Sequence, residues 1–176
     1  MSVSIRPIQK LENDDVYQMF QDIPEEENDA TNHANGMNRS DFDEFCKQMD
    51  ARSIAKANGK KEFPDGKVPQ TMYIIFNDEI PVGFGKFRPF LNEACIRNRA
   101  GHFAYMISPK HRGKGYATTF LSFIKSEALK LGLNELEGTV LEKNTVSCHI
   151  MEKVGGRIKE RVESDIVYTI DLNRRH

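Results

Sequence analysis

The chain has 176 residues, which is enough for a single domain, residues 1–176, with a substantial buried core. Its 25 Lys and Arg residues against 26 Asp and Glu residues give a formal net charge of -1, so nothing in the overall charge argues for nucleic acid or an anionic membrane as a partner. The three cysteines are odd in number and form no Cys-x-x-Cys pair, which favours reduced thiols. The first residues lack an apolar signal core and no run is long enough to cross a bilayer, so we expect a cytoplasmic protein.

The first third of the chain predicts one strand and two helices. Weak alternation indicates a strand over Val3–Ile8, and Asp14 or Asp15 offers an N-cap for a short helix. A second helix is expected to open at Ser40 and to fade around Asn58, where asparagine and glycine end the apolar periodicity.

Two stretches in the same region are predicted to be loops. The first runs from Pro24 to Asn38 and contains the acidic run Glu25–Asp29, and the second covers Lys56–Pro69. The acidic run is either a solvated connector or a wall that attracts a cationic amine.

A β-hairpin is expected next. Thr71–Phe76 and Val82–Phe87 are strand-like and are separated by a short polar turn. Gly83 and Gly85 lie inside the second strand, where glycine often marks a bulge or a close approach by another part of the molecule. The following connection, Arg88–Ala100, has no predicted element.

The segment Arg112–Ala117, Arg-Gly-Lys-Gly-Tyr-Ala, lies between a predicted strand, Phe103–Ile107, and a run with apolar residues at helical spacing. The glycines therefore fall in a strand-to-helix turn. Such a turn exposes unpaired main-chain N–H groups at the positive end of a helix, which is a site for phosphate or pyrophosphate. The neighbouring arginine and lysine add two cations.

Other phosphate loops fit this segment less well. A Walker loop needs Ser or Thr after Gly-Lys, whereas Gly115 follows Lys114. A dinucleotide fingerprint needs a third glycine, and Thr118 occupies that place. A glycine-rich turn with surface charges, and no ligand, stays open as the plainest alternative.

The last part of the chain predicts one strand, one helix and two strands. Glu135–Leu141 is the strand, and Asn144 caps a helix that ends at a pair of glycines. Arg157–Val162 and Ile166–Leu172 alternate and close the chain. The whole order predicts an α/β (α+β) fold with one mixed sheet.

Two motifs in this order resemble the GNAT family of N-acetyltransferases. The family signature Gln/Arg-x-x-Gly-x-Gly/Ala is met at Arg112, Gly115 and Ala117. The segment from Asn144 to Gly155 is similar to the family pattern Asn-x-x-Ser/Ala-x-x-x-Tyr-x-Lys-x-Gly, and the whole resembles a bacterial branch of predicted acetyltransferases. The resemblance implies a mostly antiparallel sheet flanked by helices, with splayed central strands.

The resemblance also implies acetyl-CoA as donor and co-substrate, with no metal. Main-chain N–H groups of the glycine turn would hold the pyrophosphate, and main-chain groups at the end of the preceding strand would pair with the pantetheine arm and stabilise the oxyanion. The residues expected to bind the cofactor on this basis are Met106, Ile107, Arg112, Gly113, Lys114, Gly115, Tyr116, Ala117, Thr118, Asn144 and Ser147.

The resemblance assigns the catalytic acid and base less directly than it assigns the cofactor-binding residues. The tyrosine that family members use to protonate the departing thiolate falls at Met151, whose thioether has no proton to donate. Tyr105 or Tyr168 could replace it. For the base that takes the proton of the amine, His102 is the nearest group with a suitable pKa, and Glu79 is a rival.

These observations predict an acetyl-CoA-dependent N-acetyltransferase that acts by direct transfer on a primary amine of a small molecule or a protein. The alternative is a non-catalytic acyl-CoA-binding module with the same fold, and a nucleotide-binding loop is a third reading. We expect acetyl-CoA and an amine as the partners, with no nucleic acid and no membrane, and a homodimer stays open. The identity of the acceptor is not predicted.

Overall fold

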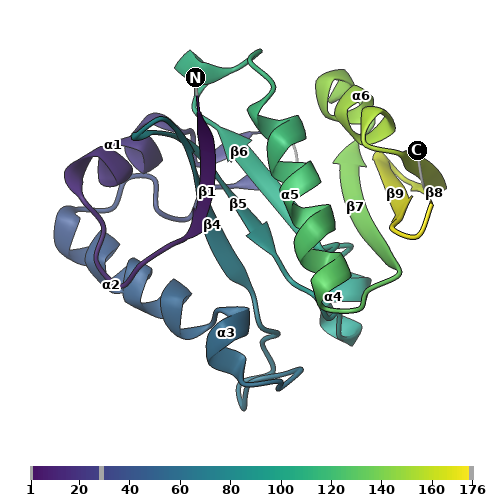
Figure 1. Cartoon of the computed structure of the whole chain (residues 1–176), viewed down its shortest axis with the longest axis horizontal. Coiled ribbons are helices and arrows are strands. Elements are labelled where there is room, and N and C mark those ends of the chain that lie inside the picture. Colours follow the sequence, from purple (N-terminus) through teal and green to yellow (C-terminus); the bar gives the residue numbers. More distant parts are fainter. Residues whose placement is uncertain (1, 28–29, 175–176) are drawn as a thin grey trace.

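The computed structural model describes residues 2–27 and 30–174. The elements follow the chain in this order (Figure 1): β1 (Val3–Pro7), α1 (Asp14–Asp22), β2 (Glu26–Glu27), β3 (Ala30–Thr31), α2 (Arg39–Ala51), α3 (Ile54–Ala57), β4 (Thr71–Asn77), β5 (Ile80–Phe87), α4 (Glu93–Arg97), β6 (Phe103–Ile107), a 3-10 turn (Pro109–His111), α5 (Tyr116–Lys130), β7 (Glu135–Leu141), α6 (Thr145–Lys153), β8 (Gly156–Val162) and β9 (Asp165–Asp171). None of the helices in the described part of the chain has the length and apolar character needed to cross a membrane.

The strands form two main sheets, which lie side by side. One has the order β1-β4-β5-β6 and the other the order β7-β9-β8, and every ladder in both is antiparallel. β6 and β7 meet only where they begin: the N–H of His102 donates to the carbonyl of Glu137 at 2.8 Å, and no ladder continues from there. The predicted mostly antiparallel sheet with splayed central strands is confirmed.

Helices cover both faces of the four-stranded sheet. In Figure 1, α1 and α2 lie on one side of this sheet and α5 on the other. Each side has its own apolar cluster. Phe20, Phe42, Ile74 and Phe84 are central to the cluster under α1 and α2. The cluster around α5 extends to the second sheet and so joins the two sheets; it includes Phe120, Ile124, Leu136 and Tyr168.

Glycine in β5 allows α5 to pack directly on the sheet. A Cβ atom at Gly85 would overlap the ring of Phe120, and one at Gly83 would lie 2.6 Å from the carbonyl oxygen of Met106. The register of the hairpin also shifts between Ile75 and Phe76, opposite this part of β5. Both the expected close approach and the expected bulge are therefore present.

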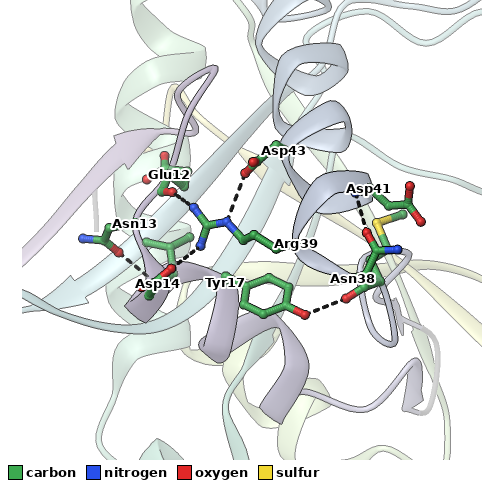
Figure 2. A network of polar contacts seen from close by, with 10 residues as sticks. Glu12, Asn13, Asp14, Tyr17, Asn38, Arg39, Asp41 and Asp43 are labelled. Carbon is green, nitrogen blue, oxygen red and sulfur yellow. Dashed lines mark hydrogen bonds and ion pairs between the residues drawn. The ribbon is translucent and has the colours of Figure 1, made fainter.

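The helix caps lie slightly earlier than the sequence predicts. Asn13, rather than Asp14 or Asp15, caps α1, and its side chain accepts from the N–H of Val16 at 3.0 Å. Asn38 caps α2, so this helix begins before Ser40 (Figure 2). In both cases the capping residue is the last one with extended backbone, as an N-cap requires, and asparagine takes that place well.

Arg39 ties α1 to α2 in the network of Figure 2. Its guanidinium donates to the main-chain oxygen of Glu12, to Asp14 at 2.8 Å and to Asp43 at 3.1 Å. The Tyr17 hydroxyl adds a bond to the carbonyl of Met37 at 2.8 Å. The two helices that cover this face of the sheet are thus held together by polar contacts as well as by their apolar cluster.

Several predicted loops and one predicted helix need correction. The loop after Pro24 contains the short hairpin β2–β3, and the connection after Arg88 contains α4, capped by Asn92. The single long helix expected after Ser40 is broken: α2 ends at Ala51 and α3 follows, ending at Asn58 in the left-handed conformation. Elements this short have too few residues for a hydrophobic period to be visible. Asn28 and Asp29 of the acidic run lie outside the described residues.

Candidate active site

A cleft of about 790 Å³ opens where β6 and β7 diverge. It extends to the glycine loop (residues 112–115) and the first turn of α5, and on the other side to β5 and the β2–β3 hairpin. Every residue expected to bind the cofactor lines this cleft: Met106, Ile107, Arg112, Gly113, Lys114, Gly115, Tyr116, Ala117, Thr118, Asn144 and Ser147. The structure therefore brings these residues together.

The main chain of β6 turns alternate residues toward β5 and toward the cleft. At the two ends of this pairing, the N–H of Arg88 donates to the carbonyl of His102 and the N–H of Ser108 donates to the carbonyl of Val82, both at 2.8 Å. In an antiparallel ladder, hydrogen-bonded pairs alternate with non-hydrogen-bonded pairs. The even-numbered residues of β6 are thus the ones that bond to β5.

The odd-numbered residues of β6 turn their main-chain groups toward β7, which has diverged. Tyr105 and Ile107 are therefore the positions where an extended ligand can add itself to the edge of β6 in the manner of a strand. Met106 was expected to offer main-chain groups to the ligand together with Ile107, but the main chain of Met106 bonds to β5. Its side chain lies in the apolar cluster under α1 and α2.

The glycine loop leaves the start of α5 without a cap. Gly113 and Gly115 have φ angles of 74° and 84°, in the left-handed region where glycine is favoured. Gly115 occupies the N-cap position and has no side chain that could cap the first turn. The first N–H groups of a helix have no helical acceptor, and the helix dipole makes this end positive. The loop is a suitable site for a phosphate group.

Arg112 is not a free cation in this site. Its guanidinium makes a two-pronged ion pair with Glu27 of β2, and its Nε donates to the carbonyl of Ile107 at 3.1 Å. Lys114, the other cation predicted beside a pyrophosphate, is exposed. Arg112 instead joins the loop to the β2–β3 hairpin, and it occupies one carboxylate of the acidic run.

Tyr105 and α6 meet across the cleft. Asn144 caps α6 as expected, accepting from the N–H of Ser147 at 3.2 Å. The Tyr105 hydroxyl lies 3.2 Å from the hydroxyl oxygen of Ser147. Met151, at the position where the family has its tyrosine, also lines the cleft and is buried. Two phenols therefore line the cleft, those of Tyr105 and Tyr116, and Tyr105 is the one that contacts α6.

His102 lies apart from these residues. It does not line the cleft but a smaller hollow beside the end of α5, together with Leu133 and Asn134. Its Nδ1 accepts from the N–H of Glu137 at 2.8 Å, so its ring helps to join the starts of β6 and β7. Burial lowers its pKa. Of the other candidates, Glu79 does not line the cleft, and Tyr168 is buried outside it, with a pKa raised to about 12 by that burial.

Three side chains of the cleft escaped sequence reasoning. His33 lies at the exposed rim, Lys86 projects from β5, and Arg88 directly follows the end of that strand. Burial lowers the pKa of Lys86 to about 8, and the nearby charge of Arg88 contributes to this shift. Burial and the charge of Lys86 lower the pKa of His33. A signal was present, because strand alternation places the buried Phe84 and these two cations on the same face of β5.

The described residues contain no group of three or more His, Cys, Asp or Glu side chains that could hold a metal ion. A cleft between two diverging strands that reaches the start of a helix has a shape suited to a long ligand that carries a phosphate. The chain belongs to the GNAT acetyltransferase family, because the family's acetyltransferase (GNAT) domain matches residues 3–157. It is therefore an N-acetyltransferase, with acetyl-CoA as its co-substrate, as the sequence predicted.

Solved structures show the same fold. A putative acetyltransferase, YncA, from Salmonella typhimurium, with its cofactor acetyl-CoA, has a TM-score of 0.64 and 12% identity, covering 100% of this chain and 97% of that one. PaiA N-acetyltransferase from Thermoplasma acidophilum, in complex with coenzyme A, has a TM-score of 0.62 and 14% identity, covering 97% and 99%. A spermidine N-acetyltransferase SpeG chimera from Vibrio cholerae and hSSAT has a TM-score of 0.63 and 14% identity, covering 99% and 100%. No curated protein matches the sequence.

Proposed function

We propose that this protein transfers the acetyl group of acetyl-CoA directly to a primary amine of a small molecule or an exposed protein amine. The observation that carries the proposal is the cleft itself. The edge of β6 that faces away from β5, the start of α5 at Gly115, and the side chains of Lys86 and Arg88 all line it. The first two features suit the donor, and the third suits an acceptor.

The donor would lie along β6. The N–H groups of the glycine loop and of the first turn of α5 would hold the pyrophosphate, with Lys114 beside it. The pantetheine amides would bond to the cleft edge of β6, and Asn144 and Ser147 line the same path from α6. The structural neighbours with acetyl-CoA or CoA bound support this arrangement.

The acceptor nitrogen would attack the thioester carbonyl, forming a C–N bond and placing negative charge on the carbonyl oxygen. The N–H of Ile107 would stabilise that oxyanion, because the odd-numbered residues of β6 face the cleft. When the C–S bond breaks, the sulfur leaves as thiolate, and Tyr105 would give it a proton. The attacking nitrogen must also lose a proton to become the amide nitrogen of the product, and that proton goes to water or to a base such as His33.

The base therefore stays open between three sources. His33 lines the cleft, and its lowered pKa keeps the imidazole neutral at pH 7 and able to accept a proton. Solvent can reach the same place because the cleft is open. His102, the base that the sequence predicted, would need a water chain from outside the cleft.

Thiol release from acetyl-CoA across a panel of amines tests the proposal, with mass spectrometry of the acetylated product. Amine-dependent release with one acetylated product for each thiol would support direct transfer. Coenzyme A binding without turnover for any amine would favour the non-catalytic module. A rise in melting temperature with ATP but not with CoA would favour the nucleotide-binding loop.

A further inference from the structure

The charges that line the cleft do not balance. Its carboxylates, among the described residues, are Glu27 and Asp165, and each is already paired. Glu27 binds Arg112, and Asp165 accepts from Arg99 Nε at 2.9 Å. No carboxylate in the described part of the cleft is left for the remaining cations.

Lys86 and Arg88 are two of those remaining cations. Lys86 lies in β5 and Arg88 directly follows the last residue of that strand, so alternation places both on one face; both are half-buried. Arg88 Nε is buried and has no hydrogen-bond partner among the described residues. Burial lowers the pKa of Arg88, and the group that acts against this is the Cys95 thiol, not a carboxylate. No described carboxylate acts on the pKa of Lys86. A buried charge without a counter-charge is costly to the fold. Its retention inside a cleft is explained if a ligand supplies the missing negative charge.

The two cations lie away from the phosphate site at the glycine loop. In the register of the sheet, Lys86 stands opposite Ala104, three residues before the end of β6 at Ile107. At about 3.3 Å per residue, this places Lys86 roughly 10 Å back along the strand from the end that leads into the loop, and Arg88 further still. The pyrophosphate at the start of α5 would not reach them.

The space around Lys86 is open enough for a ligand group. Its cross-strand neighbour on β6 is Ala104, which carries only a methyl group and also lines the cleft. His33 lies near enough to Lys86 for the ammonium to lower the pKa of the imidazole. A planar guanidinium beside an ammonium suits carboxylate or phosphate oxygens, which can accept from both at once.

We infer that Lys86 and Arg88 form an anion subsite for the acceptor, and that the acceptor is an amine carrying a carboxylate or phosphate group. This inference rests on the proposed function and names its substrate class. A polycationic amine such as spermidine, the substrate in the name of one structural neighbour, is disfavoured here by the same two charges. Glu27, the described residue of the acidic run that lines the cleft, does not offset them, because Arg112 holds it.

The experiment measures binding and turnover separately on the full chain. Calorimetry in the presence of CoA compares ω-amino acids of increasing length with their uncharged amides, with 2-aminoethyl phosphate and with spermidine. We expect one or more of the anionic amines to bind at least tenfold more tightly than the matched uncharged amine. Comparison of the ω-amino acids with 2-aminoethyl phosphate shows whether the subsite prefers a carboxylate or a phosphate.

Variants connect that preference to the two residues. Lys86→Gln and Arg88→Gln should each reduce the affinity for the anionic amine at least tenfold and leave the affinity of its uncharged analogue within threefold. Lys47→Gln is the matched control, because Lys47 is an exposed lysine of α2 outside the cleft. Removal of an uncompensated charge should not lower the melting temperature of either variant, which shows that the variants are folded.

The inference is overturned if acids and amides bind equally, if no anionic amine binds, or if spermidine binds best. It is also overturned if Lys86→Gln weakens CoA itself, because the anion would then belong to the donor. The turnover measurements distinguish a failure of the anion subsite from a failure of the proposed acetyl transfer. Acetylation of uncharged amines or spermidine without anionic preference would leave the function standing and remove the subsite. Anion binding that depends on Lys86, without thiol release for any amine, would keep the subsite and refute the transfer.

Discussion

Replacement of Gly115 by valine tests whether the glycine loop holds the phosphates. Gly115 has φ 84° and ψ 8°, and a Cβ atom built there meets no atom within 4 Å. The substitution therefore creates no clash inside the protein, and its cost to stability is the left-handed backbone, about 1–2 kcal/mol for a residue with a side chain. In the complex, the same side chain would stand where phosphate must approach the main chain.

Gly132 provides a matched control at the other end of α5. Its φ is 80°, an added Cβ also meets nothing within 4 Å, and it does not line the cleft. Gly132→Val and Gly115→Val should thus lose similar stability, roughly 2–8 °C in melting temperature. In calorimetry, only Gly115→Val should bind CoA at least tenfold more weakly, which corresponds to about 1.4 kcal/mol. Equal CoA affinity in the two folded variants would refute the phosphate role of the loop.

Four further results are expected. Asn144→Asp keeps an N-cap oxygen but loses the amide donor, so thermal denaturation should be unchanged while CoA affinity falls severalfold in calorimetry. Tyr105→Phe should lower kcat by roughly 10²-fold with little change in the dissociation constant of CoA, and an unaltered kcat would remove Tyr105 as the acid. His33→Ala should lower turnover at neutral pH more than His102→Ala does, with partial recovery at high pH; the reverse order would restore His102 as the base. The pKa of Lys86, about 8, lies below the ordinary 10.5, so the unfolded chain binds this proton more tightly and stability should rise between these pH values. Lys86→Gln should lack that rise, and its free energy of unfolding in denaturant should exceed that of the wild type by roughly 3 kcal/mol at pH 7. Parallel pH profiles of the free energy of unfolding for the two proteins would contradict the burial of this charge.

The sequence by itself determined the local chemistry of the donor site. The strand-to-helix turn with Gly113 and Gly115, the cap at Asn144 and the helical spacing of α5 all depend on residues close together in the chain. Such features are encoded by local backbone preference and by periodicity, so they can be predicted without knowledge of the fold. The hairpin β4–β5 and the close approach at Gly85 followed from the same kind of pattern.

Only the tertiary structure decided how the cleft is charged and which side chains face it. Arg112 and Glu27 are 85 positions apart, and nothing in the sequence indicated their ion pair, which links the glycine loop to the β2–β3 hairpin. His102 was placed outside the cleft by its bond to Glu137, and Lys86 and Arg88 were placed inside it. Strand alternation tells which residues share a face, but it does not tell what that face meets. That depends on where β6 and β7 separate, which is set by the packing of the two sheets around α5 and not by any short stretch of sequence.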